Sequence, residues 1–350
     1  MNTQTIQDRI LSGSFTRLYY HYLYWVKFFS RRNAIKSKMS SKPKEEQISM
    51  IKVWWIMVIK LWLPAEYFSY HYKFLTRKER RKYVLNWEKD VFANKVNNER
   101  VHTLLDDKYA SFLHFREFYQ REVVLINFDD DLSKAKSFFN RHPKAIVKKN
   151  TGGGGHAVQI VDVHNYSSID ALYFSLKNQY HSKKIVLEEL IQQDSKMGSL
   201  HPQSVNTLRM SAIRIAQDIL FFHPFMRIGR GDSIVDNGGR GGILAAIDEK
   251  TGCIIAAVVE DGTDYTVHPD TNIPLIGFQI PFWEEAKAFT IKLMEALPEG
   301  VYISWDIALS EKGWVMIEGN SRGQFLGQQS PIHKGVRDEF EEIKKELKCK

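Results

Sequence analysis

The segment Val301–Asn320 constrains the fold of this chain more than any other stretch. It consists of two runs of apolar and β-branched residues on either side of Ser310–Gly313. Such runs are typical of short strands, and Gly313 can adopt the left-handed backbone conformation that a tight turn requires. The segment is therefore predicted to be a β-hairpin.

The predicted hairpin places two carboxylates face to face. If Glu311–Gly313 forms a three-residue loop, Asp306 lies directly across from Glu318, and Asn320 follows on the same face, about 7 Å along. Facing carboxylates repel each other unless a cation lies between them. Two carboxylates and an amide oxygen are hard ligands that suit Mg²⁺ shared with nucleotide phosphates. The alternative is a solvated hairpin with scattered polar residues.

Charge is distributed unevenly along the chain. Residues 1–100 hold 20 Lys and Arg against 8 Asp and Glu, whereas the remaining 250 residues hold 29 against 33. A basic N-terminal region followed by a slightly acidic remainder indicates a partner with an anionic surface, either a membrane or a nucleic acid. The chain has only two cysteines, and its first residues are polar and lack the apolar core of a signal peptide. We therefore expect a cytoplasmic protein.

Two segments rich in aromatic and apolar residues lie within the basic N-terminal region. Phe15–Arg32 interleaves aromatic with basic residues, and Met50–Leu63 is an apolar run that holds Lys52 and Lys60. The second run is too short and too charged for a spanning helix, which needs about 20 apolar residues. For residues 15–63, two interpretations stay open: an anchor lying in the inner membrane surface, or a helical subdomain packed on the body. Nucleic acid is not expected as a partner, because the aromatics lie in strongly apolar runs.

A glycine-rich loop between two predicted strands is a second candidate for binding phosphate. It lies in Val147–Asp162 and contains four consecutive glycines: Gly152, Gly153, Gly154 and Gly155. Ordering four glycines costs conformational entropy, which indicates that the loop needs unusual backbone dihedrals or a close approach of its backbone to another group. Hairpin tips of this kind present backbone N–H groups to phosphate, and Lys148 precedes the loop. The loop matches neither a P-loop nor a dinucleotide fingerprint, and a plain flexible hairpin is the alternative.

Further polar residues follow on predicted strands and loops. Glu188 and Glu189 end the predicted strand Lys184–Ile191, where backbone beside a carboxylate can hold adenine. Two predicted strands and a glycine-rich loop then carry three arginines, which can bind anions through two parallel hydrogen bonds: Arg209, Arg227 and Arg240.

These motifs, in this order, resemble the ATP-grasp superfamily over Leu104–Gln329. Their order along the chain is Asp107-Lys108, Lys148 before the glycine loop, Glu188-Glu189, then Asp306, Glu318 and Asn320. D-alanine–D-alanine ligase and the ribosomal-protein glutamate ligases look similar across this span. The sugar-transfer-associated ATP-grasp group, found with polysaccharide synthesis, looks most similar in four segments: Val205–Arg209, Asp236–Gly242, Trp305–Leu309 and Ile317–Asn320.

The chain is expected to have an α+β fold in three parts. Residues 1–100, basic and rich in aromatics, look helical, whereas many ATP-grasp enzymes begin with an α/β domain. Two α+β subdomains, at residues 101–185 and 186–350, would then clasp ATP between them in the ATP-grasp fold.

The resemblance also implies a role for each motif residue. ATP phosphates would contact Lys108, Lys148 and the glycine loop, Gly152 to Gly155. The nucleoside would be held through adenine contacts from Glu188, Glu189 and Leu190, and a ribose contact from Asp194. Two Mg²⁺ ions would be bound by Asp306, Glu318 and Asn320. The γ-phosphoryl and the carboxylate substrate would be held by Arg209, Arg227 and Arg240.

The implied activity is an ATP- and Mg²⁺-dependent ligase that joins a carboxylate to an amine or thiol through an acyl phosphate. Its acid and amine substrates would be small or glycan-linked, in polysaccharide or cell-surface glycan synthesis. Two alternatives stay open: a phosphotransferase acting on a hydroxyl, and a non-catalytic nucleotide-binding scaffold at the membrane surface. Ser304 departs from D-alanine–D-alanine ligases, which have arginine at this position, so transition-state charge must be neutralised elsewhere.

Overall fold

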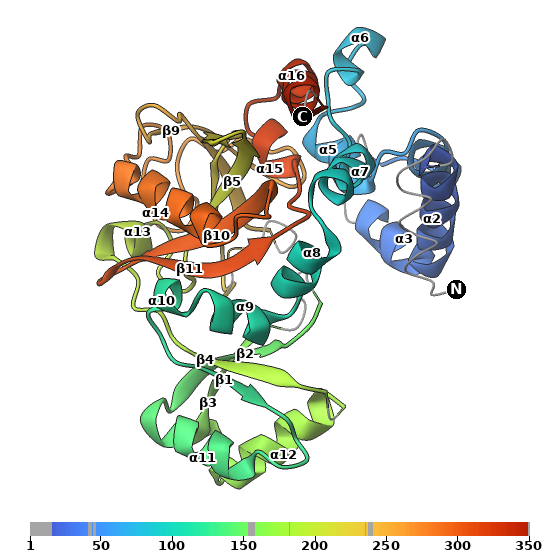
Figure 1. Ribbon diagram of the computed structural model, residues 1–350. Coiled ribbons are helices and arrows are strands. Elements are labelled where there is room, and N and C mark those ends of the chain that lie inside the picture. Colours follow the sequence, from blue (N-terminus) through green and yellow to red (C-terminus); the bar gives the residue numbers. More distant parts are fainter. Residues whose placement is uncertain are drawn as a thin grey trace.

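The computed structural model describes residues 16–40, 44, 47–152, 158–181, 183–234, 236 and 241–348. Within these residues, a group of N-terminal helices precedes a small sheet and a larger sheet (Figure 1). The predicted α+β class is confirmed, and so is the helical N-terminal region. No described helix is both long and apolar enough to cross a bilayer.

The N-terminal helices pack around an aromatic core. They are α2 (Thr16–Ser30), α3 (Arg32–Ser40), α4 (Met50–Trp54), η1 (Trp55–Ile59), α5 (Pro64–Ser69), α6 (Arg77–Arg80) and α7 (Asn86–Val96). Every fourth residue of α2 is buried, which gives the helix a core-facing stripe. Pro64 begins α5, where the missing N–H leaves no helical hydrogen bond unmade. Tyrosine is the commonest residue of this core, which also contains Trp62, Phe28, Phe68 and several aliphatic side chains.

Trp62 and Trp55 provide a test of this packing. Trp62 is 6% exposed, and its ring lies 4.6 Å from that of Tyr72, whereas Trp55 is 42% exposed. Trp62→Ala should lower the free energy of unfolding by about 3–5 kcal/mol, because it leaves a cavity. Trp55→Ala should lower it by less than about 1 kcal/mol. Urea titration of both variants checks this, and equal losses would contradict the packing described.

The small sheet is antiparallel in the order β1-β4-β2-β3. Its strands are β1 (Val123–Ile126), β2 (Lys144–Lys149), β3 (Gln159–Asp162) and β4 (Ile185–Glu189). The short η2 (Val163–Asn165) follows β3. Two amphipathic helices, α11 (Leu132–Arg141) and α12 (Ile169–Gln179), bury their apolar residues against one face of the sheet (Figure 1).

Three short helices lead from the N-terminal group to the small sheet: α8 (Glu99–Asp106), α9 (Lys108–His114) and α10 (Arg116–Tyr119). Leu104–Phe118 has the pattern of one amphipathic helix with Asp106 or Asp107 as its N-cap. The cap at Asp107 is confirmed, but the single helix is wrong, because the segment is divided among α8, α9 and α10. Extended backbone at Asp107 breaks it, and the Asp107 carboxylate caps α9 by accepting from Ala110 N at 2.8 Å. Asn150 holds this break in place, because its carbonyl accepts from Lys108 N at 2.9 Å and its amide donates to Asp107 at 2.8 Å.

The larger sheet is antiparallel in the order β11-β10-β5-β7-β8-β9, with β6 also paired to β5. Its strands are β5 (Thr207–Ile215), β6 (Asp218–Phe221), β7 (Phe225–Ile228), β8 (Ile243–Ile247), β9 (Ile254–Val259), β10 (Tyr302–Ser310) and β11 (Gly313–Asn320). Helix α14 (Trp283–Glu295) packs on this sheet. The remaining helices are α13 (Ser195–Leu200), α15 (Leu326–Gln329) and α16 (Arg337–Lys348).

The β10–β11 hairpin has the predicted carboxylate pairing but not the predicted loop. Ser310 pairs with Gly313, so the loop contains two residues rather than three. A bulge beside Ile307 then shifts the register by one residue, and Asp306 faces Glu318 as predicted. Gly313 has φ 107°, which confirms its expected backbone conformation. The bulge compensates for the shorter loop, because a one-residue slip would have turned one carboxylate to the opposite face.

Candidate nucleotide and metal site

The three predicted metal ligands come together on the β10–β11 hairpin. Asp306 is fully buried because β10 lies between β5 and β11, whereas Glu318 and Asn320 on β11 are half-buried. The Asn320 amide nitrogen lies 3.4 Å from Asp306 Oδ2 and 3.4 Å from Glu318 Oε1. Two carboxylates and one side-chain amide thus converge on one face of the sheet. The Asn320 amide turns its nitrogen toward the carboxylates, and its oxygen would have to take that place to bind a metal.

Two of the predicted arginines flank Asp306. Arg209 lies opposite it on β5, with Nε 2.6 Å from Asp306 Oδ1, and Arg227 Nη2 lies 2.9 Å from Oδ2. Burial raises the pKa of Asp306, and the two arginines oppose that rise. The 2.6 Å contact lacks hydrogen-bond geometry, so Arg209 Nε and Asp306 Oδ1 are buried without a hydrogen-bond partner. An oxygen with unused lone pairs therefore lies within the predicted ligand set.

The donor chemistry of this face fits magnesium. Mg²⁺ is commonly bound through one or two carboxylates, with waters and substrate phosphates completing its octahedron. Among the described residues, no group of three or more His, Cys, Asp or Glu side chains could hold a metal. A metal on this face of the sheet would use Asp306 and Glu318, with Asn320 as the third protein ligand. Burial raises the pKa of Glu318, but Lys148, Arg209 and Arg227 outweigh that effect and lower the pKa below its ordinary value.

A buried ion-pair cluster links the two sheets beside the hairpin. Glu188 on β4 lies 3.0 Å from Lys148 Nζ and 2.9 Å from Arg121 Nη2, one cation at each oxygen. Although burial raises the pKa of Glu188, Lys148 and Arg121 lower it to about 2. Arg121 also donates to Met316 O on β11 at 2.6 Å. If adenine contacts the Glu188 carboxylate, that carboxylate would therefore contact adenine and these two cations at the same time.

Lys108 lies at the entrance to the glycine loop. Its Nζ donates to Gly152 O at 2.7 Å, and burial lowers its pKa. Gly152 has φ 95°, a conformation that favours glycine. The other predicted loop and substrate residues lie outside the described part of the chain: Gly153, Gly154, Gly155 and Arg240.

A cavity of about 630 Å³ opens between the two sheets. Apolar side chains from both sides form part of its wall, among them Ile146, Ile160 and Ile317, which suits a flat aromatic ring. Six of the predicted site residues line it: Lys148, Glu188, Glu189, Leu190, Asp194 and Arg227. Two of their carboxylates already accept backbone hydrogen bonds, Glu189 from Glu122 N and Asp194 from the first turn of α13.

Sequence reasoning missed three residues that orient the site: Arg121, Thr207 and Asp236. Thr207 Oγ1 accepts from Arg227 Nε at 3.1 Å and from Nη2 at 2.9 Å, and it donates to Asp236. This contact holds the Arg227 guanidinium against Asp306. Thr207 and Asp236 lie within segments already noted for their arginines, but Arg121 precedes a strand without any motif.

Comparisons with known proteins give the family of this chain. A family model described as sugar-transfer associated ATP-grasp matches residues 88–345. Three similar solved structures are D-alanine–D-alanine ligase from Helicobacter pylori, D-alanyl-alanine synthetase A from Vibrio cholerae and a RimK domain ATP-grasp protein from Sphaerobacter thermophilus. Sequence identities are 17%, 12% and 10%, and TM-scores are 0.47, 0.40 and 0.39.

The alignments with these structures cover 74%, 69% and 71% of this chain, and 68%, 60% and 69% of those chains, respectively. The chain thus spans less than two thirds of the Vibrio cholerae structure. No curated protein matches the sequence significantly.

Proposed function

This chain belongs to the sugar-transfer-associated ATP-grasp family, and on that premise we propose that it is an ATP- and Mg²⁺-dependent ligase. In this proposal, residues 101–185 and 186–350 form the two halves of the clasp, with adenine in the cavity between the sheets. The single observation that supports it best is the convergence of Asp306, Glu318 and Asn320 with two arginines beside this cavity.

The proposed phosphate path runs from the cavity to the hairpin. Lys148 and Arg227 both line the cavity, and Arg227 also touches Asp306. Lys108 and the glycine loop would close over the phosphates from the small-sheet side. When bound, Mg²⁺ would neutralise phosphate charge, and its protein ligands would be Asp306, Glu318 and Asn320.

The proposed reaction proceeds in two steps. A substrate carboxylate oxygen attacks the γ-phosphorus, the bond to the bridging oxygen breaks, and ADP leaves an acyl phosphate behind. The lone pair of an amine then attacks the acyl carbon, the C–O bond to phosphate breaks, and the amine proton passes to solvent. Arg209 and Arg227 would hold the two anions together in this process.

The ligase is preferred to a phosphotransferase because of how Asp306 is held. A kinase needs a general base beside the acceptor hydroxyl. Asp306 contacts two arginines, and in this proposal its remaining lone pairs bind Mg²⁺, so it is not free to take a proton from an acceptor hydroxyl. Formation of a carbon–nitrogen bond on a glycan-linked substrate is the more specific part of this proposal, and the family description bears only on the sugar, through the words sugar-transfer associated.

Heavy-oxygen transfer tests the proposed chemistry. ADP release should first be screened against pools of amino acids and amino sugars to find an acid and an amine. With ¹⁸O in the carboxylate of that acid, we expect one labelled oxygen in the released phosphate, because the acyl phosphate transfers it. Mass spectrometry of the phosphate measures this. Finding the γ-phosphate retained on an organic product would reject the ligase in favour of phosphotransfer.

A further inference from the structure

Helix α2 is apolar on two opposite faces. Its buried stripe faces the aromatic core: Tyr20, Tyr24 and Phe28. A second stripe, with helical spacing of four, three and four, is between 47% and 65% exposed: Leu18, Tyr22, Trp25 and Phe29. The rings of Trp25 and Phe29 lie 5.0 Å apart, so the exposed side chains form a continuous surface. Core packing accounts for the first stripe and leaves the second without a role.

The segment formed by α4 and η1 carries a matching stripe beside α2. Ile51 is 81% exposed, and Trp55 and Ile59 follow at intervals of four residues, both exposed. The two helical segments are neighbours, because His21 Nδ1 on α2 lies 2.6 Å from Val58 O on η1. We call the two exposed stripes the N-terminal apolar face: Leu18, Tyr22, Trp25, Phe29, Ile51, Trp55 and Ile59.

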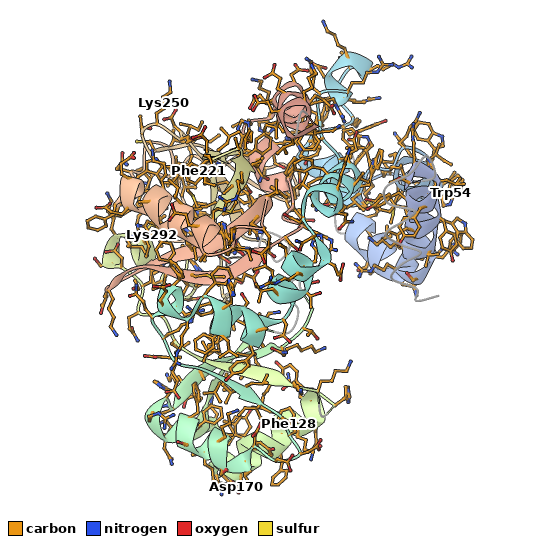
Figure 2. The ribbon with its side chains drawn as sticks, in the orientation of Figure 1. Trp54, Phe128, Asp170, Phe221, Lys250 and Lys292 are labelled. Atoms are coloured by element: carbon orange, nitrogen blue, oxygen red, sulfur yellow. The ribbon has the colours of Figure 1, made fainter. Side chains whose placement is uncertain are left out.

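The N-terminal apolar face lies away from the catalytic sheets. Helix α2 forms the outer edge of the N-terminal group, with α5 and α7 between it and the large sheet (Figure 1). Figure 2 shows Trp54 at the same edge, remote from the small-sheet helix that carries Asp170. A large partner could therefore cover this face without obstructing the cavity.

The charge around this face is almost entirely positive. Residues 15–63 contain ten Lys and Arg against two Asp and Glu. Lys60 places its ammonium 4.6 Å from the centre of the Trp55 ring, while Arg31, Arg32 and Lys52 are exposed. Exposed aromatics beside long basic side chains are typical of helices lying at the headgroup level of a bilayer. A second copy of this chain would bring an equally basic face into contact, which like-charge repulsion disfavours.

We propose that the N-terminal apolar face docks onto an anionic lipid bilayer, with α2 and the α4–η1 segment lying in the membrane plane. The aromatic and aliphatic side chains would enter the interface, and the flanking lysines and arginines would contact lipid phosphates. Neither segment crosses the bilayer in this arrangement, since no described helix is long and apolar enough to do so.

Vesicle co-sedimentation with the full chain tests this docking. Vesicles that contain phosphatidylglycerol should bind the protein, and pure phosphatidylcholine vesicles should bind it more weakly. Added salt should reduce binding to the anionic vesicles. The triple variant Tyr22→Ser, Trp25→Ser and Phe29→Ser should lose about tenfold or more in affinity, because it removes apolar area from the interface.

Two matched variants keep the test decisive. Phe174→Ser removes a similarly exposed ring from α12, 53% exposed, and should bind vesicles like the unaltered protein. Lys52→Gln with Lys60→Gln changes only exposed charges, should keep the melting temperature, and should weaken binding to anionic vesicles alone. The proposal is overturned if the unaltered protein does not bind anionic vesicles. It is also overturned if the folded triple variant binds these vesicles as tightly as Phe174→Ser does. A change of the triple variant in oligomeric state rather than in vesicle binding would assign the face to self-association instead.

Discussion

Replacing Glu318 by glutamine should lower Mg²⁺-dependent ATP turnover about a hundredfold or more, because it removes one of two carboxylate ligands. The fold should survive. Glu318 is half-buried, and none of the ion pairs found among the described residues involves it. Glutamine keeps the side-chain volume while removing the charge. ADP release measured across a range of Mg²⁺ concentrations gives the effect, and a melting curve confirms the fold.

A control for this variant lies on the same hairpin. Glu311→Gln changes an exposed carboxylate in the two-residue loop and should leave turnover unchanged. Unchanged turnover of Glu318→Gln at limiting Mg²⁺ would remove Glu318 from the metal site. Asp306→Asn is a less selective probe, because it leaves Arg209 buried without a counter-charge and Arg227 with Asp236 alone, 3.7 Å away. Such a loss costs about 3–5 kcal/mol of stability, so reduced turnover would mix unfolding with metal loss.

Replacing Glu188 by glutamine should destabilise the protein by about 3 kcal/mol at neutral pH. The variant leaves Lys148 and Arg121 without the carboxylate that both contact. The folded pKa of about 2 lies below the ordinary value of 4.5. The carboxylate therefore stabilises the fold above about pH 4.5, and this contribution is lost as pH falls toward about 2.

Unfolding by urea at neutral pH and at about pH 3 measures this dependence. The difference in stability between the unaltered protein and Glu188→Gln should be largest at neutral pH and should shrink in acid. Glu122→Gln serves as control, because its carboxylate pairs with Arg141 near the surface and should contribute no more than about 1 kcal/mol. A difference for Glu188→Gln that stays constant across this pH range would rule out the buried ion pair as its cause.

Local sequence determined which elements form and which residues they carry. Alternating apolar residues around Gly313 were sufficient to predict the hairpin, and the pairing of Asp306 with Glu318 was predicted from an assumed three-residue loop. The loop length was wrong, and the pairing held only because a bulge beside Ile307 compensated for the difference. The segment around Asp107 is a similar case, since the cap at Asp107 was predicted but the division into α8, α9 and α10 was not.

Tertiary structure decided what surrounds these elements. Arg209 and Arg227 reach Asp306 because β10 pairs with β5 and β5 with β7, a strand order that no local pattern contains. Arg121 meets Glu188 across 67 residues for the same reason. On α2, both apolar stripes have helical spacing, so the sequence could not say which one would face the core. Periodicity is a property of one segment, whereas burial and ion pairing depend on neighbours that only the folded chain brings together.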